Sequence, residues 1–158
     1  MAGIIQIETI GASDGRLDAV RELWAAYWQS QGFAPEFQGF EVERLGLPGL
    51  YAAPRGRLLL AEVDGVAAGT AALRACGERA CEAKRLFVRP EHRGLGVAKA
   101  LLVRLVDEAR AAGYATMYGD TMASMASALR LYEQLGFREV GPYAAHPTPG
   151  AIYLKLEL

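Results

Sequence analysis

A glycine-containing loop at residues 89–98 holds the residues whose types and spacing most clearly allow chemistry. Gly94 and Gly96 lie where an apolar strand ends and a helical pattern begins, and Arg93 precedes them. Backbone N–H groups at a helix start have no partner within the helix, and glycine has no side chain to keep an anion away from them. The loop therefore predicts a pyrophosphate-binding site, with Arg93 as an added cation.

Two other phosphate-binding motifs do not fit this loop. A dinucleotide fingerprint needs a third glycine, whereas Ala98 and Lys99 follow Gly96, and a Walker loop is absent. On these residues alone, two alternatives stay open. One is a helix start that binds nothing, and the other is a nucleotide-binding enzyme of a different class.

The cysteines and histidines do not predict a metal site. Cys76 and Cys81 flank a short turn, and His92 and His146 are far apart in the sequence. A four-ligand cage would need carboxylates from distant segments, so no metal is expected. The two cysteines are expected to be buried free thiols, although a hairpin would bring them near one another.

Alternating and helical apolar patterns predict the elements that must position the loop. Asp64-Gly65 joins two β-compatible runs and is typical of a hairpin turn. Strand, helix and strand over residues 80–118 predict a right-handed parallel crossover, and the whole order predicts a mixed α/β fold. The expected elements are a strand at 4–8, helices at 14–30 and 37–47, strands at 57–63, 66–75 and 80–88, a helix at 94–113, a strand at 114–118, a helix at 124–135 and a strand at 151–158.

Length and composition exclude several classes of protein. The chain has 158 residues, of which 52% are hydrophobic and 22% charged, as in an ordinary single globular domain. A net charge of −1 argues against nonspecific attraction to nucleic acid or anionic membrane. No transmembrane segment or signal peptide is recognised, which predicts a cytoplasmic protein.

Two segments in the second half carry a family resemblance. They read Arg93-Gly94-Leu95-Gly96-Val97-Ala98, after Leu86-Phe87-Val88-Arg89-Pro90, and Ala128-Leu129-Arg130-Leu131-Tyr132-Glu133-Gln134-Leu135-Gly136-Phe137. The first is similar to the acetyl-CoA signature of the Gcn5-related N-acetyltransferase (GNAT) superfamily, and the second resembles that superfamily's second motif. The resemblance implies a GNAT-like single α/β domain over residues 1–158, with a mixed central sheet of six to seven strands flanked by about four helices. It also implies acetyl-CoA as the cosubstrate.

The resemblance also implies the cofactor contacts. The N–H groups of residues 93–98 would bind the pyrophosphate, and the main chain of Phe87 and Val88 would contact the pantetheine arm and the oxyanion. Two positions depart from the family pattern. Glu91 stands where a Gln or Arg is usual, and Met125 stands where an Asn is frequent, which leaves Ser124 or Ser127 as substitutes.

Acetyl transfer to an amine needs a base for the amine, an oxyanion site and a proton for the thiolate. By the resemblance, Tyr132 is the candidate acid, with a packed, capped hydroxyl as the alternative. Glu82 is the candidate base. Strand alternation predicts that it shares a face with Lys84 and Leu86. Its alternative is a carboxylate paired to Lys84 or Arg85.

Aromatic and basic residues are candidates for the acceptor site, with core or solvent positions as the alternative. A loop containing Tyr143, His146 and Pro147 could close over it. The candidates for lining the site or pairing with a substrate carboxylate are Trp24, Tyr27, Trp28, Phe33, Phe37, Phe40, Arg74, Lys84 and Arg85.

The expected function is transfer of an acetyl group to the primary amine of a small molecule by direct attack in a ternary complex, with an amino-acid-like acceptor as one candidate. The expected partner is that amine, with no nucleic acid and no membrane, and the family makes a homodimer plausible. A non-catalytic acyl-CoA sensor is the main alternative, because it would keep the loop and not need Tyr132.

Overall fold

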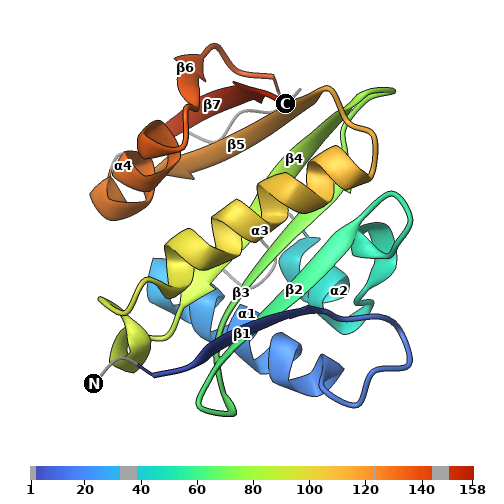
Figure 1. Cartoon of the computed structure of the whole chain (residues 1–158), viewed down its shortest axis with the longest axis vertical. Coiled ribbons are helices and arrows are strands. Elements are labelled where there is room, and N and C mark those ends of the chain that lie inside the picture. The colour runs from blue at the N-terminus through green and yellow to red at the C-terminus, as the bar shows by residue number, and fades with distance from the viewer. Residues whose placement is uncertain (1–2, 33–38, 123, 144–149) are drawn as a thin grey trace.

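A single seven-stranded sheet organises the computed structural model, which describes residues 3–32, 39–122, 124–143 and 150–158. The strand order is β1-β2-β3-β4-β5-β7-β6 (Figure 1). The elements are β1 (Ile5–Thr9), α1 (Leu17–Gln31), α2 (Phe40–Leu45), the 3-10 turn η2 (Gly49–Tyr51), β2 (Arg57–Val63), β3 (Val66–Ala75), β4 (Ala80–Val88), the 3-10 turn η3 (Pro90–His92), α3 (Val97–Ala111), β5 (Thr116–Met122), α4 (Ala126–Gln134), β6 (Arg138–Val140) and β7 (Ala151–Glu157).

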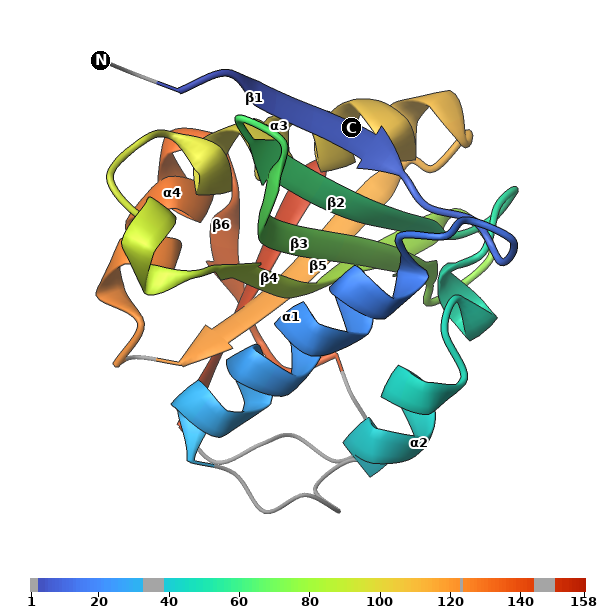
Figure 2. The same ribbon diagram turned by 90° about the horizontal axis from the view of Figure 1, so that it is seen from below.

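Helices cover both faces of this sheet. Strands β4 and β5 run parallel and are joined through α3, while the other neighbouring strands pair antiparallel. Helices α1 and α2 lie on one face and α3 on the other (Figure 2). The parallel unit and the mixed α/β class are therefore as the sequence predicts. No helix in the described ranges is long and apolar enough to cross a membrane.

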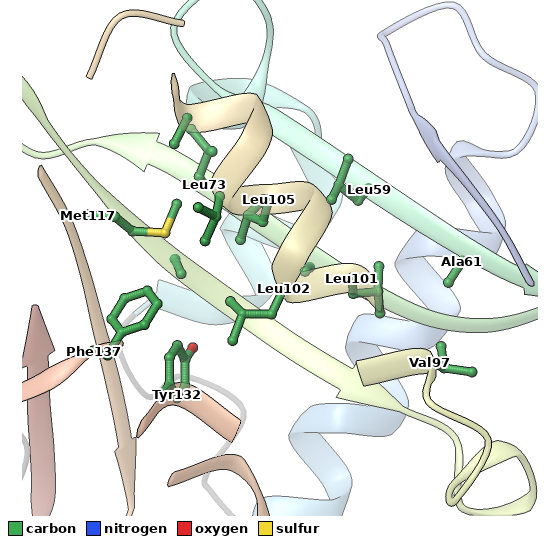
Figure 3. Close-up of a cluster of buried hydrophobic side chains, with 14 of the residues drawn as sticks. Leu59, Ala61, Leu73, Val97, Leu101, Leu102, Leu105, Met117, Tyr132 and Phe137 are labelled. Atoms are coloured by element: carbon green, nitrogen blue, oxygen red, sulfur yellow. The ribbon is translucent and has the colours of Figure 1, made fainter. Parts of the chain in front are cut away.

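Each face has its own hydrophobic cluster. On one face, the apolar stripe of α3 packs on the sheet, with Leu101, Leu102 and Leu105 almost fully buried (Figure 3). On the other face, Trp24 of α1 is fully buried and stacks against Phe40 of α2 at 5.8 Å between ring centroids. Burial of large apolar side chains on both faces fixes the strands between the two helical layers.

A β-bulge interrupts the alternation of side chains in β4. Thr70 of β3 lies opposite Phe87, but Ala72 lies opposite Lys84, so β4 has one residue more than β3 over this stretch. The backbone at Arg85 is left-handed, with φ 60°, and this accommodates the extra residue. Beyond it Leu86 packs on the α3 side and Phe87 on the α1 side. The prediction that Leu86 shares a face with Glu82 and Lys84 is therefore wrong.

Strands β4 and β5 pair over only part of their length. The parallel ladder joins Ala80–Ala83 to Thr116–Gly119 and then stops, while β5 continues to pair with β7 as far as Met122. The carboxyl-terminal halves of β4 and β5 consequently diverge, and the edge of β4 that faces β5 carries no ladder over its last five residues, 84–88, all of which the structure describes.

Several boundaries differ from those expected. The hairpin strands and β4 have the predicted bounds, but β5 begins at Thr116 and runs past the predicted end at Tyr118, because β7 supplies hydrogen bonds beyond Gly119. The prediction that both cysteines are free thiols is confirmed, but the prediction that both are buried is wrong for one of them. Cys81 is buried, whereas Cys76 is exposed because it follows the end of β3.

Gly69 holds β3 close to the bulged part of β4. A Cβ at this position would lie 2.8 Å from the carbonyl oxygen of Phe87, which is backbone and cannot rotate away. We expect Gly69→Ala to lower the free energy of unfolding by about 1–3 kcal/mol. In Gly11→Ala the added Cβ meets no atom within 4 Å, so stability should change by less than about 0.5 kcal/mol. Urea unfolding measures both, and equal changes would contradict the close approach.

Candidate functional site

The loop between β4 and α3 presents backbone amides at the start of α3. Gly94 and Gly96 have φ of 82° and 86°, a left-handed conformation that favours glycine, and added Cβ atoms there would meet open space. Among the described residues, no side chain caps the first turn of α3. The N–H groups of that turn are thus available to an external acceptor.

Arg93 brings a cation to the same loop. Its Nε donates to the carbonyl oxygen of Val88 at 2.9 Å, and its guanidinium lies 5.8 Å from the ring centroid of Phe87. These contacts hold the side chain against the end of β4 rather than in open solvent. The positive charge therefore lies where the helix start already favours an anion.

A groove of about 680 Å³ runs from this loop along the end of β4 to the start of α4. We call it the cofactor groove. Most of the predicted cofactor-binding residues line it, but Leu95 and Tyr132 do not. Those that do are Phe87, Val88, Arg93, Gly94, Gly96, Val97, Ala98 and Ser124.

A second, smaller pocket of about 70 Å³ continues from the groove into the opening between β4 and β5. We call it the inner pocket. Four residues line both spaces, which makes them neighbours: Gln31, Leu86, Met125 and Ala128. The polar residues lining the inner pocket are Tyr27, Gln31, Lys84, Arg85, Asp120, Thr121 and Tyr132.

Glu82 lies beside this pocket but not in its lining. The carboxylate is 6% exposed, accepts a hydrogen bond from Arg74 Nε at 2.6 Å and lies 3.8 Å from Lys84 Nζ. Arg74 is its cross-strand neighbour on β3. The sequence predicts Lys84 or Arg85 as the partner of Glu82. In the structure Glu82 pairs with Lys84 and with Arg74, whereas Arg85 pairs with Glu43.

Asp120 is the carboxylate that does line the inner pocket. Its Oδ1 lies 3.5 Å from Lys84 Nζ, and its side chain is 28% exposed. Sequence reasoning missed it, because the predicted strand ends at Tyr118 and leaves Asp120 in a connection. It reaches the pocket because β7 continues to pair with β5 from Asp120 to Met122, beyond the last residue that pairs with β4.

Tyr132 lines the inner pocket and also belongs to the core cluster on the α3 side. The ring packs edge-on against Phe137 at 5.0 Å (Figure 3) and sits against Gly119, where a Cβ would come within 3.1 Å of Cε1. Burial, reinforced by the negative charge of Asp120, raises the pKa of Tyr132 above its ordinary value. The hydroxyl therefore keeps its proton at any working pH.

Arg85 is held between the pocket and the aromatic cluster under α1. Its Nη2 donates to Glu43 Oε2 at 3.0 Å, and its guanidinium lies 5.1 Å from the ring centroid of Phe40 and 5.5 Å from that of Trp24. Burial opposes its charge, but Tyr51 and Glu43 outweigh that effect and raise the pKa of Arg85. It is a permanent cation in a largely apolar setting.

Comparison with known proteins identifies this architecture. The model of the Acetyltransferase (GNAT) family matches residues 17–137. An uncharacterized N-acetyltransferase of Schizosaccharomyces pombe is 35% identical over 144 residues, 90% of this chain and 88% of the relative. The chain belongs to the GNAT acetyltransferase family.

Two solved structures share the fold of this GNAT acetyltransferase. A Staphylococcus aureus acetyltransferase of the GNAT family has a TM-score of 0.80 at 18% identity, covering 98% of this chain and 99% of its own. A Salmonella typhimurium protein, solved with its cofactor acetyl-CoA, has a TM-score of 0.71 at 22% identity, covering 97% and 93%. The GNAT prediction and the predicted sheet of six to seven strands with four helices are confirmed.

The two departures from the GNAT pattern lie at different places. Glu91 is exposed in η3 and lies off the groove lining, whereas Met125 lines both spaces at their junction. Ser124 and Ser127 line the cofactor groove. The hydroxyls proposed as substitutes are therefore near the groove, and the apolar Met125 side chain is at the entrance to the inner pocket.

The predicted acceptor residues lie in several different environments. Tyr27, Trp28, Lys84 and Arg85 line the inner pocket. Trp24 and Phe40 are core residues with under 2% exposure, and Arg74 is paired to Glu82. Phe33, Phe37, His146 and Pro147 lie outside the described residues. The ring of Tyr143 packs against that of Tyr118 in a tilted arrangement, with 4.6 Å between the ring centroids, outside the lining of either space.

Proposed function

We propose that this protein transfers the acetyl group of acetyl-CoA to the primary amine of a small, amino-acid-like molecule in a ternary complex. The observation that carries the proposal is the junction of the two spaces: a groove with a phosphate-type loop at one end opens, at Leu86, Met125 and Ala128, into a pocket lined by an acid, a carboxylate and two cations. Cofactor and acceptor could occupy the two spaces at once.

In this proposal the pyrophosphate binds to the amides of the loop and to Arg93. Each charge-assisted contact contributes about 1.5–3 kcal/mol, so a few of them suffice to anchor the cofactor. The pantetheine arm follows the edge of β4 at Phe87 and Val88, which β5 leaves unpaired. Its thioester then reaches the junction with the inner pocket, where the main chain of β4 offers donors to the oxyanion.

The transfer step needs proton movements at the amine and at the thiolate. A carboxylate takes a proton from the ammonium of the acceptor, and the neutral amine then attacks the thioester carbon. As the C–S bond breaks, Tyr132 protonates the departing thiolate, and the amide nitrogen gives its surplus proton to the tyrosinate. A tyrosine is a weaker acid than a thiol, so proton transfer to the thiolate is uphill, and re-formation of the carbonyl in the collapsing tetrahedral intermediate drives it. Tyr132 is suited to the role because it lines the inner pocket and stays protonated.

We propose Asp120 as the carboxylate that receives the amine proton, with Glu82 as the alternative named from the sequence. Asp120 lines the inner pocket and its one ion pair among the described residues is with Lys84. Glu82 has both oxygens near cations, Oε1 at Arg74 and Oε2 at Lys84.

Localisation in the cytoplasm, a homodimer, and the absence of nucleic-acid or membrane partners stay predictions from the sequence.

Gly94→Asp tests the cofactor groove, and Gly113→Asp is its matched control. Both glycines have a left-handed backbone with open space around them, one before α3 and one after it. Both variants should lose similar stability, but only Gly94→Asp places a negative charge where the phosphates bind. Acetyl-CoA at 100 times its dissociation constant stabilises a protein that binds it by about 2.7 kcal/mol, which raises the thermal midpoint. We expect acetyl-CoA to raise the midpoint of Gly113→Asp and not that of Gly94→Asp. A rise in both variants would contradict the groove assignment.

Tyr132→Phe should lower kcat on the order of 100-fold because the thiolate loses its proton donor, with little change in acetyl-CoA affinity. Since burial raises the pKa of Tyr132, the wild-type rate should not fall at high pH until well above pH 10, the ordinary value for tyrosine. Tyr118→Phe on β5 removes a hydroxyl outside the pocket and serves as the control. Wild-type turnover in Tyr132→Phe would exclude it as the acid.

Asp120→Asn separates the two carboxylates when it is compared with Glu82→Gln. A base is needed only while the amine arrives protonated, so loss of the base should matter less as pH rises through the pKa of the amine. We expect the kcat/KM defect of Asp120→Asn to shrink with rising pH, and that of Glu82→Gln to be independent of pH. The reverse pattern would assign the base to Glu82.

A further inference from the structure

One hydrogen-bond donor of Arg85 is unpaired within the part of the chain that the structure describes. Its side chain is 8% exposed, yet Nε has no partner among the described residues, while Nη2 is bonded to Glu43. Buried donors are nearly always paired, and a guanidinium offers its donors in a fixed planar fork that matches a carboxylate. An unmatched donor on a residue that lines the inner pocket indicates that a ligand completes the set.

The fold holds this guanidinium in place from several elements. The left-handed backbone at Arg85 turns its side chain toward the α1 face, where Phe40 and Trp24 pack near it. Glu43 of α2 accepts from Arg85 through Oε2 and from the hydroxyl of Tyr51 through Oε1. A left-handed conformation is unfavourable for a residue other than glycine, asparagine or aspartate. A strained backbone and a fixed side chain together are typical of a preorganised binding group.

The other cations near the pocket are already matched. Lys84 lies near two carboxylates, Glu82 and Asp120, and Arg74 is bonded to Glu82 outside the pocket lining. Arg85 has one carboxylate, Glu43, which it shares with Tyr51. Among the described cations of this region, Arg85 is therefore the one best able to accept a further negative charge.

We propose that Arg85 binds the carboxylate of the acceptor, so that the substrates are small molecules that carry both an amine and a carboxylate. This inference rests on the proposed function, in which the amine lies near Asp120 and the thioester near Leu86. Arg85 and Asp120 line the same pocket from β4 and β5. A bound amino acid would thus have its carboxylate at Arg85 of β4 and its amine at Asp120 of β5.

The experiment compares amino acids with the amines left when their carboxylate is removed. Alanine is paired with ethylamine, leucine with isopentylamine and phenylalanine with phenethylamine, each at saturating acetyl-CoA. The wild-type kcat/KM should favour the amino acid by about 10- to 100-fold, the range expected for a charge-assisted contact. Arg85→Gln should remove that preference by raising KM for the amino acid about 10- to 100-fold, with less than about 3-fold change for the amine.

Two further variants keep the test decisive. Arg85→Lys retains the charge and loses the planar fork, so it should recover part of the preference and fold even if Arg85→Gln does not. Arg44→Gln changes an arginine of α2 whose ion pair with Glu41 faces solvent, and it should behave as wild type.

Three results overturn the inference: a wild type that acetylates simple amines as well as amino acids, equal loss for both acceptors in Arg85→Gln, and an amino-acid preference that survives in both Arg85 variants. A failure of the proposed function looks different. In that case acetyl-CoA still shifts the thermal midpoint, but no amine of either kind releases CoA.

Discussion

The whole site depends on one extra residue in β4. The bulge at Arg85 carries the strand through a left-handed turn, so that Arg85 and Phe87 face α1, while Leu86 and Val88 pack toward α3. The ladder between β4 and β5 ends two residues earlier, at Ala83. A regular strand of the same length would point Arg85 at the α3 core, where a guanidinium has no partner.

An opening between two strands costs backbone hydrogen bonds, and the packing around it explains why it persists. The α3 stripe and the aromatic cluster of α1 and α2 clamp β4 from opposite faces. Gly69 lets β3 approach the bulged stretch, and β7 takes over the pairing of β5 where β4 leaves it. Rigid neighbours thus maintain a gap that isolated strands would close.

The sequence predicts the parts of the site that depend on local rules. Glycines before an apolar helix specify the loop, and the Asp64-Gly65 turn fixes the hairpin. The bulge escapes prediction because arginine is an ordinary strand residue and nothing nearby signals a left-handed backbone. Asp120 is missed for a related reason: Gly119 and Asp120 have low β propensity, and Asp120 is a strand residue because it pairs with Tyr153 of the distant β7.

The same pairing of distant strands explains why Glu82 is held in ion pairs while Asp120 lines the inner pocket. Glu82 lies in the paired part of β4, directly opposite Arg74, so its burial is compatible with a charge only because cations hold both oxygens. Asp120 lies just beyond Gly119, the last residue of β5 that pairs with β4, where these two strands have parted and the pocket begins. Lys84 lies between them and contacts both. Glu82 therefore helps to fix the position of Lys84, which in turn lies 3.5 Å from Asp120, and Asp120 is the one of these two carboxylates that lines the inner pocket.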